Sequence, residues 1–159
     1  MSHATDQKVP LDRTEARQTM SGLEYMRKMM NGELPPSGMV QLLGLKLVEV
    51  SEGRAVFTVQ PDESHYNGLG IAHGGLAATL LDSALGCAIN ATMPPGKIFT
   101  TLEMKINYVR PITRERGELR CEANMIHAGG RVATAEGRIV DREGKIYAHG
   151  TATCMLFRA

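Results

Sequence analysis

One carboxylate stands alone in the apolar part of this chain. Between Ser64 and Gly96 the one formally charged residue is Asp82, which lies within the apolar segment 75–90 (GLAATLLDSALGCAIN). Burying an unpaired carboxylate costs several kcal/mol, so the group must be paired, neutralised or used. The structural alternative is an acid that reaches an arginine or a backbone N–H. Because isolated acids in apolar surroundings are enriched at active sites, we interpret Asp82 as catalytic and expect its apolar neighbours to raise its pKa.

A glycine-rich loop leads directly into the same segment. It reads HYNGLGIAHGG from His65 to Gly75. Glycines at a helix N-terminus let a ligand approach N–H groups that have no partner within the helix. Those donors and the positive end of the helix dipole suit a carbonyl oxygen that becomes an oxyanion. The loop indicates oxyanion stabilisation, and a tight loop without a ligand is the alternative.

Hydrophobic periodicity predicts the elements that position these groups. Residues 75–90 are apolar nearly all round, which predicts a helix without a solvent-facing side. Alternating residues and turn signals predict strands at 45–50, 54–60, 98–109, 117–127, 131–140 and 145–157. Two strands, one buried helix and four strands predict an α+β fold, in which an antiparallel β-sheet wraps around a long central α-helix.

The region before this unit has a different pattern. Residues 1–11 are expected to form a flexible tail. Over residues 12–31 the apolar side chains recur at three- and four-residue spacing, which predicts one amphipathic helix that ends at Asn31-Gly32. Residues 32–159 then form the main domain.

Composition excludes several classes of function. Lys plus Arg number 18 against 17 for Asp plus Glu, so no basic excess favours nucleic acid. The cysteines (Cys87, Cys121 and Cys154) have no C-x-x-C spacing, and no His, Asp or Glu cluster has metal-ligand spacing, so we expect neither a disulfide framework nor a metal. No segment resembles a signal peptide or a membrane span, so we expect a cytoplasmic protein without membrane contact.

Taken together, these motifs resemble the hotdog-fold acyl-CoA thioesterases of the PaaI type. The resemblance runs from about Gly32 to Phe157. It is carried by the segment GELPPSGMVQLLGLKL, the H-x-N-x-x-G-x-x-HGG loop, the LLDSALG helix, the strand end YVRP and the hairpin GGRVATAEGRIVDREGKIYAHGTAT. It implies a hotdog fold with an extra N-terminal helix, and hydrolysis of an aryl or medium-chain acyl-CoA.

The resemblance also implies roles for catalytic residues. Asp82 would be the nucleophile or the general base that activates water. The N–H of Gly74 would polarise the thioester carbonyl, and His73 would support that loop. Asn67 would orient the water or the carbonyl, and Thr101 would lie near the acid.

Substrate contacts follow from the same resemblance. They would come from His65, Gly75, Arg110 and Arg131, with the two arginines near the phosphates or the pantetheine arm of coenzyme A. Coenzyme A enters as part of the substrate, and no separate cofactor is expected.

The spacing of Gly74 and Asp82 bears on the assembly. Eight residues of helix rise about 12 Å, so Asp82 cannot act on a carbonyl held at Gly74 of the same helix. If both serve one reaction, they come from different subunits, which predicts at least a homodimer. The resemblance implies a homotetramer.

Two other functions stay open on the sequence. A hotdog dehydratase or hydratase would pair His73 with Asp82, although the H-F-P-G and D-x-x-x-x-H segments of those enzymes are missing. A non-catalytic acyl-CoA-binding module would retain the fold without turnover. Cys87, about one helical turn beyond Asp82, is interpreted as a buried, inert thiol because no cationic neighbour in sequence lowers its pKa.

Overall fold

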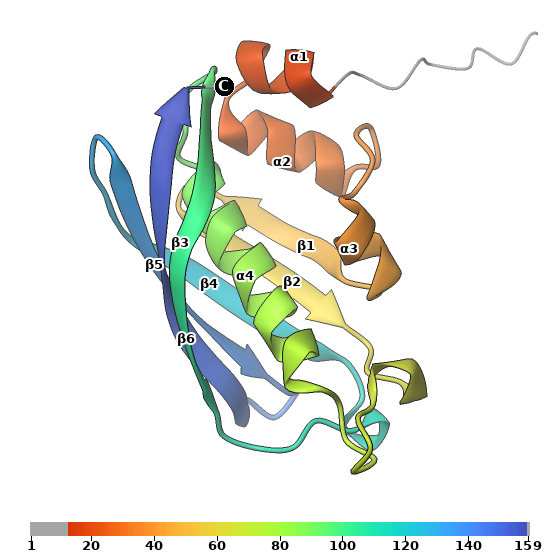
Figure 1. Ribbon diagram of the computed structural model, residues 1–159. Helices are drawn as coiled ribbons and strands as arrows, with labels where there is room; N and C mark the ends of the chain where they lie inside the picture. Colours follow the sequence, from red (N-terminus) through yellow and green to blue (C-terminus); the bar gives the residue numbers. More distant parts are fainter. Residues whose placement is uncertain (1–12, 159) are drawn as a thin grey trace, which may run out of the picture.

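A six-stranded antiparallel sheet curves around one long helix in the computed structural model, which describes residues 13–158 (Figure 1). The order across the sheet is β1-β2-β4-β5-β6-β3. The strands are β1 (Lys46–Ser51), β2 (Arg54–Val59), β3 (Lys97–Tyr108), β4 (Leu119–Ala128), β5 (Val132–Val140) and β6 (Ile146–Arg158). The enclosed helix is α4 (Gly74–Asn90). The predicted α+β hotdog architecture is confirmed, and each predicted strand end lies within two residues of the observed one.

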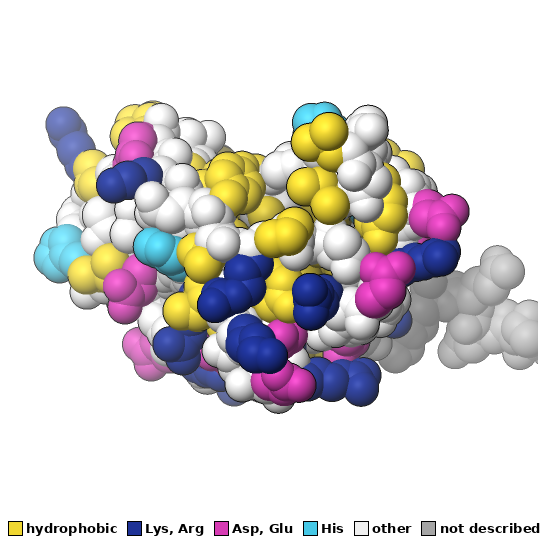
Figure 2. All heavy atoms as spheres, turned by 90° about the horizontal axis from the view of Figure 1, so that it is seen from below, with side chains coloured by type: hydrophobic (Ala, Val, Ile, Leu, Met, Phe, Trp, Pro, Cys, Tyr) yellow, Lys and Arg dark blue, Asp and Glu magenta, His cyan; other side chains and the backbone are white. Residues whose placement is uncertain are grey.

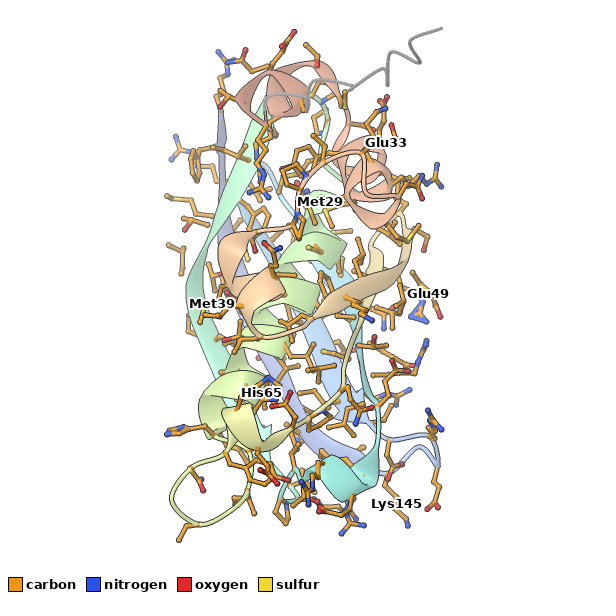
Figure 3. The ribbon with its side chains drawn as sticks, turned by 90° about the vertical axis from the view of Figure 1, so that its right-hand side faces the viewer. Met29, Glu33, Met39, Glu49, His65 and Lys145 are labelled. Atoms are coloured by element: carbon orange, nitrogen blue, oxygen red, sulfur yellow. The ribbon has the colours of Figure 1, made fainter. Side chains whose placement is uncertain are left out.

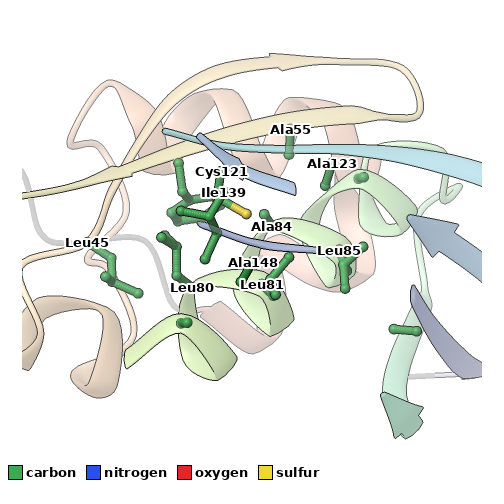
Figure 4. Close-up of a cluster of buried hydrophobic side chains, with 14 of the residues drawn as sticks. Leu45, Ala55, Leu80, Leu81, Ala84, Leu85, Cys121, Ala123, Ile139 and Ala148 are labelled. Carbon is green, nitrogen blue, oxygen red and sulfur yellow. The ribbon is translucent and has the colours of Figure 1, made fainter. Parts of the chain in front are cut away.

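Large side chains on the helix and small ones on the strands bring α4 close to the sheet. The helix buries Leu80, Leu81 and Leu85 at helical spacing. Several strand positions in the same core are alanines: Ala55, Ala123, Ala133, Ala135, Ala148 and Ala152. Figure 4 shows this contact, with Cys121 and Ile139 filling the space between them. Because burial of apolar area stabilises by roughly 25 cal/mol per Å², this interface favours the folded state and fixes α4 against the sheet.

One side of α4 remains uncovered in the single chain. Gly75 and Asp82 are exposed, and Ala78 and Thr79 between them are half-buried. The expectation of a helix without a solvent-facing side is therefore wrong for this stripe. The sheet wraps one side of the helix, and the N-terminal helices contact the other side only near Cys87, so the stripe from Gly75 to Asp82 stays exposed in residues 13–158. The apolar enclosure that was expected around Asp82 is not supplied by the chain alone.

The strand beside that stripe is the last in the sheet. β3 pairs with β6 along its whole length and has no neighbour on its other edge among the described residues. It carries exposed apolar side chains at Leu102 and Tyr108. A long edge strand with unpaired backbone groups and apolar side chains is a ready surface for another strand.

The N-terminal region forms two helices rather than the predicted single one. These are α1 (Arg13–Thr19) and α2 (Gly22–Met30). Ser21 caps α2, since its Oγ accepts a hydrogen bond from the N–H of Glu24 at 3.2 Å. The chain is also drawn onto the end of α4, because the N–H of Gly22 donates to the carbonyl of Met93 at 2.8 Å. A Cβ on Gly22 would lie 1.6 Å from the carbonyl oxygen of Asn90, so only glycine fits there.

These helices belong to the same body as the sheet. Ala16, Tyr25, Met26 and Leu34 form a second buried cluster that reaches Leu47 on β1 and Cys87 on α4. A short helix, α3 (Gly38–Leu42), follows and leads into β1. Figure 1 shows α1 beside the end of β3 near the C-terminus, with α2 between it and β1. The predicted tail, residues 1–11, lies outside the described residues.

Candidate active site

His65 shapes the loop that leads into α4. It ends the short 3-10 turn η1 (Glu63–His65), where its Nδ1 accepts a hydrogen bond from the N–H of Asp62 at 3.1 Å. Its carbonyl accepts one from the N–H of His73 at 2.8 Å, which fixes the start of the helix. The side chain is only 6% exposed. Figure 3 shows His65 beside the N-terminal end of α4, where it supports the loop and lines a different cavity from Gly74.

Asn67 holds the tip of the same loop. Its Oδ1 accepts a hydrogen bond from the N–H of Leu69 at 2.9 Å, and its own N–H donates to the carbonyl of Ile71 at 2.8 Å. The first bond occupies Oδ1, the acceptor of the side-chain amide, and the second involves only the backbone. The amide NH₂ is the part of Asn67 that can donate to a ligand.

The first turn of α4 opens into a cavity of about 420 Å³. The cap residue His73 makes no side-chain hydrogen bond to the helix, so the first N–H groups have no side-chain acceptor there. The cavity, which we call the Gly74 cavity, is lined by Asn67, Ile71, Ala72, His73, Gly74, Ala77, Tyr108, Val109, Arg110, Pro111, Ile112 and Tyr147. Asn67 and Gly74, which were expected to act on the carbonyl or the water, and His73, which was expected to support the loop, thus line the same cavity.

Tyr108 is a site residue that the sequence did not reveal. Its hydroxyl donates to the carbonyl of Gly74 at 3.2 Å, and a Cβ on Gly74 would lie 3.3 Å from the tyrosine ring. Glycine therefore lets the ring lie against the helix start. The available signal was the position of Tyr108 at the end of a predicted strand, which does not say what the ring touches.

Asp82 lies in a second cavity, of about 200 Å³, which we call the Asp82 cavity. Thr101 on β3 donates from Oγ1 to Asp82 Oδ1 at 2.9 Å, so the structure brings these two predicted residues together. The other walls come from the N-terminal helices and from Cys87, Asn90 and Phe99. Figure 3 shows Met29, another wall residue, beside the other half of α4 from His65. The two cavities share no lining residue.

The cysteine that lines the Asp82 cavity, Cys87, has a thiol with a raised pKa. Burial raises the pKa of the Cys87 thiol to about 12, with the nearby charge of Arg17 opposing the shift and that of Asp82 adding to it. Burial also raises the pKa of Cys121 and of Cys154. Since the thiolate is the nucleophilic form, the raised pKa disfavours attack by Cys87 at neutral pH. Its side chain is half-buried, where a buried thiol was expected.

The remaining predicted contacts are divided between the two ends of the sheet. Arg110 lines the Gly74 cavity, and its backbone N–H donates to the carbonyl of Tyr147 at 3.1 Å. Arg131 lies in the β4–β5 turn at the opposite end of the sheet, where its carbonyl accepts from the N–H of Leu156 at 2.8 Å. Gly75 is exposed on the first turn of α4 and lines neither cavity.

Residues 13–158 contain neither a cluster of metal ligands nor a helix suited to a membrane. No group of three or more His, Cys, Asp or Glu side chains within this range could hold a metal ion. None of the helices in the same range is both long and apolar enough to cross a membrane.

Comparison with known proteins identifies the family. Residues 69–148, about half of the chain, match the Thioesterase superfamily. The chain is 31% identical over 108 residues to acyl-coenzyme A thioesterase 13 of Mus musculus, covering 67% of this chain and 76% of the relative. It is 26% identical to a 1,4-dihydroxy-2-naphthoyl-CoA hydrolase of Listeria monocytogenes, covering 69% of this chain and 87% of that one.

A solved structure agrees with the sequence comparison. A mutant form of the phenylacetic acid degradation protein PaaI from Thermus thermophilus superposes with a TM-score of 0.68 at 29% identity, covering 75% of this chain and 98% of that one. The hotdog fold that the sequence resemblance implied is therefore shared with a protein of the PaaI type. This chain belongs to the thioesterase superfamily and is a hydrolase that acts on thioester bonds.

Proposed function

We propose that the protein hydrolyses an acyl-CoA thioester, with an aryl or medium-chain acyl group, to the free acid and coenzyme A. The observation that carries this proposal is the division of one chemical task along α4. The Gly74 cavity offers backbone donors, and the Asp82 cavity offers a carboxylate held by Thr101. Hydrolysis of a thioester in this way needs both the donors and the carboxylate, and neither cavity of a single chain contains both.

The donors in the Gly74 cavity suit the thioester carbonyl. When a nucleophile adds to the carbonyl carbon, negative charge develops on its oxygen. The N–H of Gly74, at the positive end of α4, is already in place before the reaction and stabilises that charge as it develops. Asn67 supports the same oxygen or the attacking water through its amide NH₂. Fixed donors of this kind are worth about 10²- to 10³-fold in rate.

Asp82 supplies the second requirement. As a general base it takes a proton from water while the water oxygen bonds to the carbonyl carbon; as a nucleophile its own oxygen forms that bond. In either route the C–S bond breaks, and the thiolate of coenzyme A leaves and takes up a proton. In the nucleophilic route this leaves an anhydride between Asp82 and the acyl group, which water then cleaves to release the free acid and restore the carboxylate. Thr101 donates to Oδ1, which stabilises the ionised carboxylate and leaves Oδ2 available for the reaction. No separate cofactor is needed, because coenzyme A arrives with the substrate.

The two halves meet when two chains associate. Gly74 and Asp82 are separated by about 12 Å along one helix axis, so a single carbonyl cannot contact both. The uncovered side of α4 lies beside the free edge of β3, where Leu102 and Tyr108 are exposed. Pairing of two such edges around a twofold axis would place Asp82 of one chain towards Gly74 of the other. We propose a homodimer as the smallest active unit, with the tetramer as a further assembly.

Cationic side chains lie at the end of the molecule that carries the Gly74 cavity. Figure 2, which looks at this end of the molecule, shows Lys and Arg side chains gathered beside apolar ones. Arg110 lines the cavity, and Arg116 lies close enough to its wall residue Tyr147 to oppose the rise in pKa that burial imposes on that tyrosine. We propose that Arg110 and Arg116 attract the phosphates of coenzyme A. Arg131 lies too far away to do so in the same chain.

Release of thiol from a panel of acyl-CoAs tests the function. The panel compares benzoyl-, phenylacetyl-, hexanoyl- and palmitoyl-CoA on the wild type, on Asp82→Asn and on Glu52→Gln, an exposed acid in the turn between β1 and β2 as a control away from the β3 edge and both cavities. We expect turnover of an aryl or medium-chain member, a loss of at least about 10³-fold in kcat for Asp82→Asn, and no change for the control. No thiol release from any acyl-CoA by folded wild-type protein would refute the proposal and favour a binding module.

A further inference from the structure

The Asp82 cavity continues beneath the N-terminal helices. Its apolar walls are Met26, Met29, Val40, Phe57 and Phe99, and its volume is about 200 Å³. An apolar cavity of about 150 Å³ holds a benzene molecule. The space beyond Asp82 therefore holds a short acyl group, and a long acyl chain exceeds it.

One wall of this cavity is polar, and two of its donors have no partners. Tyr25 is only 3% exposed, and its hydroxyl has no hydrogen-bond partner in the described part of the chain. The Nε of Arg13, also buried, has none either. A buried donor without a partner is costly, and native proteins retain few of them. Both side chains line the same cavity as Asp82.

A second guanidinium gives the wall a positive charge. Arg17 lies over the ring of Tyr25, 4.7 Å from its centroid, and also lines the cavity. Neither Arg13 nor Arg17 takes part in an ion pair within residues 13–158, and Asp82 is the sole acid among the residues that line this cavity. Unpartnered donors beside fixed positive charge suit an acceptor that is itself negatively charged.

Resting on the thioesterase chemistry of the proposed function but revising its acyl group, we propose that α1 and α2 form a subsite for the far end of the acyl group, and that Tyr25 and Arg17 select short acyl groups that end in a carboxylate over plain aryl or medium-chain groups. The preferred substrates would then be coenzyme A monothioesters of short dicarboxylic acids. Asp82 acts on the thioester end, and the donors of the N-terminal helices bind the opposite end. The extra N-terminal helices thus set the specificity of the enzyme.

A matched pair of substrates tests this subsite. Glutaryl-CoA ends in a carboxylate, and 5-methylhexanoyl-CoA replaces that carboxylate with an isopropyl group of nearly the same shape. We expect the wild type to hydrolyse glutaryl-CoA with a kcat/KM at least about tenfold higher, because a hydrogen bond to a charged group is worth that much or more. Equal values, or a preference for the isopropyl substrate, would overturn the inference.

Two variants assign the preference to named side chains. Tyr25→Phe deletes only the unpartnered hydroxyl, so the fold and the melting temperature are expected to be retained. It should lower kcat/KM for glutaryl-CoA about tenfold and leave 5-methylhexanoyl-CoA within about twofold. Arg17→Met should act in the same direction, whereas Arg27→Met, which removes an exposed charge from α2 outside the cavity, should not. Equal losses on both substrates would contradict a specificity role.

The outcomes also separate this inference from the proposed function. If neither member of the pair is hydrolysed but another acyl-CoA is, and Asp82→Asn abolishes that turnover, the function stands and the carboxylate subsite is wrong. If no acyl-CoA releases thiol, the proposed function falls and the subsite falls with it.

Discussion

The Gly74 cavity and the Asp82 cavity lie along the same helix but present different chemical groups to a ligand. The first is made by a loop and the start of α4, and what it offers a ligand is mainly backbone N–H groups and Arg110. The second is made by side chains from all four α-helices and from β2 and β3, and it offers a carboxylate held at 2.9 Å by Thr101. One cavity can bind developing negative charge, and the other can deliver a nucleophile.

This contrast explains why the chain leaves part of its central helix uncovered. A buried α4 would enclose Asp82 but would also keep a thioester away from it. The open stripe that carries Gly75 and Asp82 lies beside the free edge of β3, so a partner chain can cover the helix and complete the site in one step. In the proposed dimer, assembly and catalysis depend on the same surface.

The largest effect in the Gly74 cavity is expected from removing one N–H. Gly74 is the first residue of α4, a position that accepts proline without loss of helix structure. Gly74→Pro should lower kcat by about 10²- to 10³-fold, since it deletes an oxyanion donor. Gly74→Ala adds the same Cβ against Tyr108 and retains the N–H, so it should lose no more than a few-fold. Equal losses in the two variants, measured by steady-state thiol release, would show that crowding and not the donor matters.

A smaller effect is expected from the residue that holds the carboxylate. Thr101→Val removes the hydrogen bond to Asp82 with little change in shape, and we expect kcat to fall about tenfold. Thr101→Ser retains the hydroxyl and should recover most of that loss. Thr151→Val, at an exposed position on β6 away from the free edge of β3, is the matched control and should leave kcat unchanged. A Thr101→Val enzyme as active as the wild type would mean that Asp82 needs no such support.

The smallest effect is expected at the thiol beside Asp82. Because the pKa of Cys87 is raised to about 12, only about one thiol in 10⁴ is ionised at pH 8. Labelling of native protein with a thiol reagent should be very slow there and should accelerate about tenfold for each pH unit up to about 11. Cys87→Ala should retain kcat within about twofold. Rapid labelling at pH 8 that abolishes thioesterase activity would contradict the assignment of the chemistry to Asp82.

Much of the fold could be predicted from the sequence because its signals are local. Alternation along the strands and the apolar run of α4 placed every strand and the central helix within two residues of their observed ends. The break at Ser21 was missed because the apolar spacing continues through it. Its cause is the contact of Gly22 with the end of α4, which lies far away in the chain.

The site was harder to predict because its contacts join residues that are far apart in the chain. Glycines before an apolar helix and a lone acid within it drew attention to Gly74 and Asp82. Periodicity does not say which side of a helix the sheet leaves open, so the exposure of Asp82 was missed. The contact of Tyr108 with Gly74 and the position of Tyr25 beside Asp82 are long-range, and no local pattern encodes them.

Complementation between two inactive variants tests the shared site most directly. Asp82→Asn and Gly74→Pro chains, carrying different affinity tags, are co-expressed, and the mixed dimer is purified through both tags. One of its two sites then combines the intact Asp82 of one chain with the intact Gly74 of the other. A shared site predicts about half of the wild-type kcat per dimer from two variants that are each inactive alone. A mixed dimer as inactive as its parents would contradict it and would confine the chemistry to a single chain.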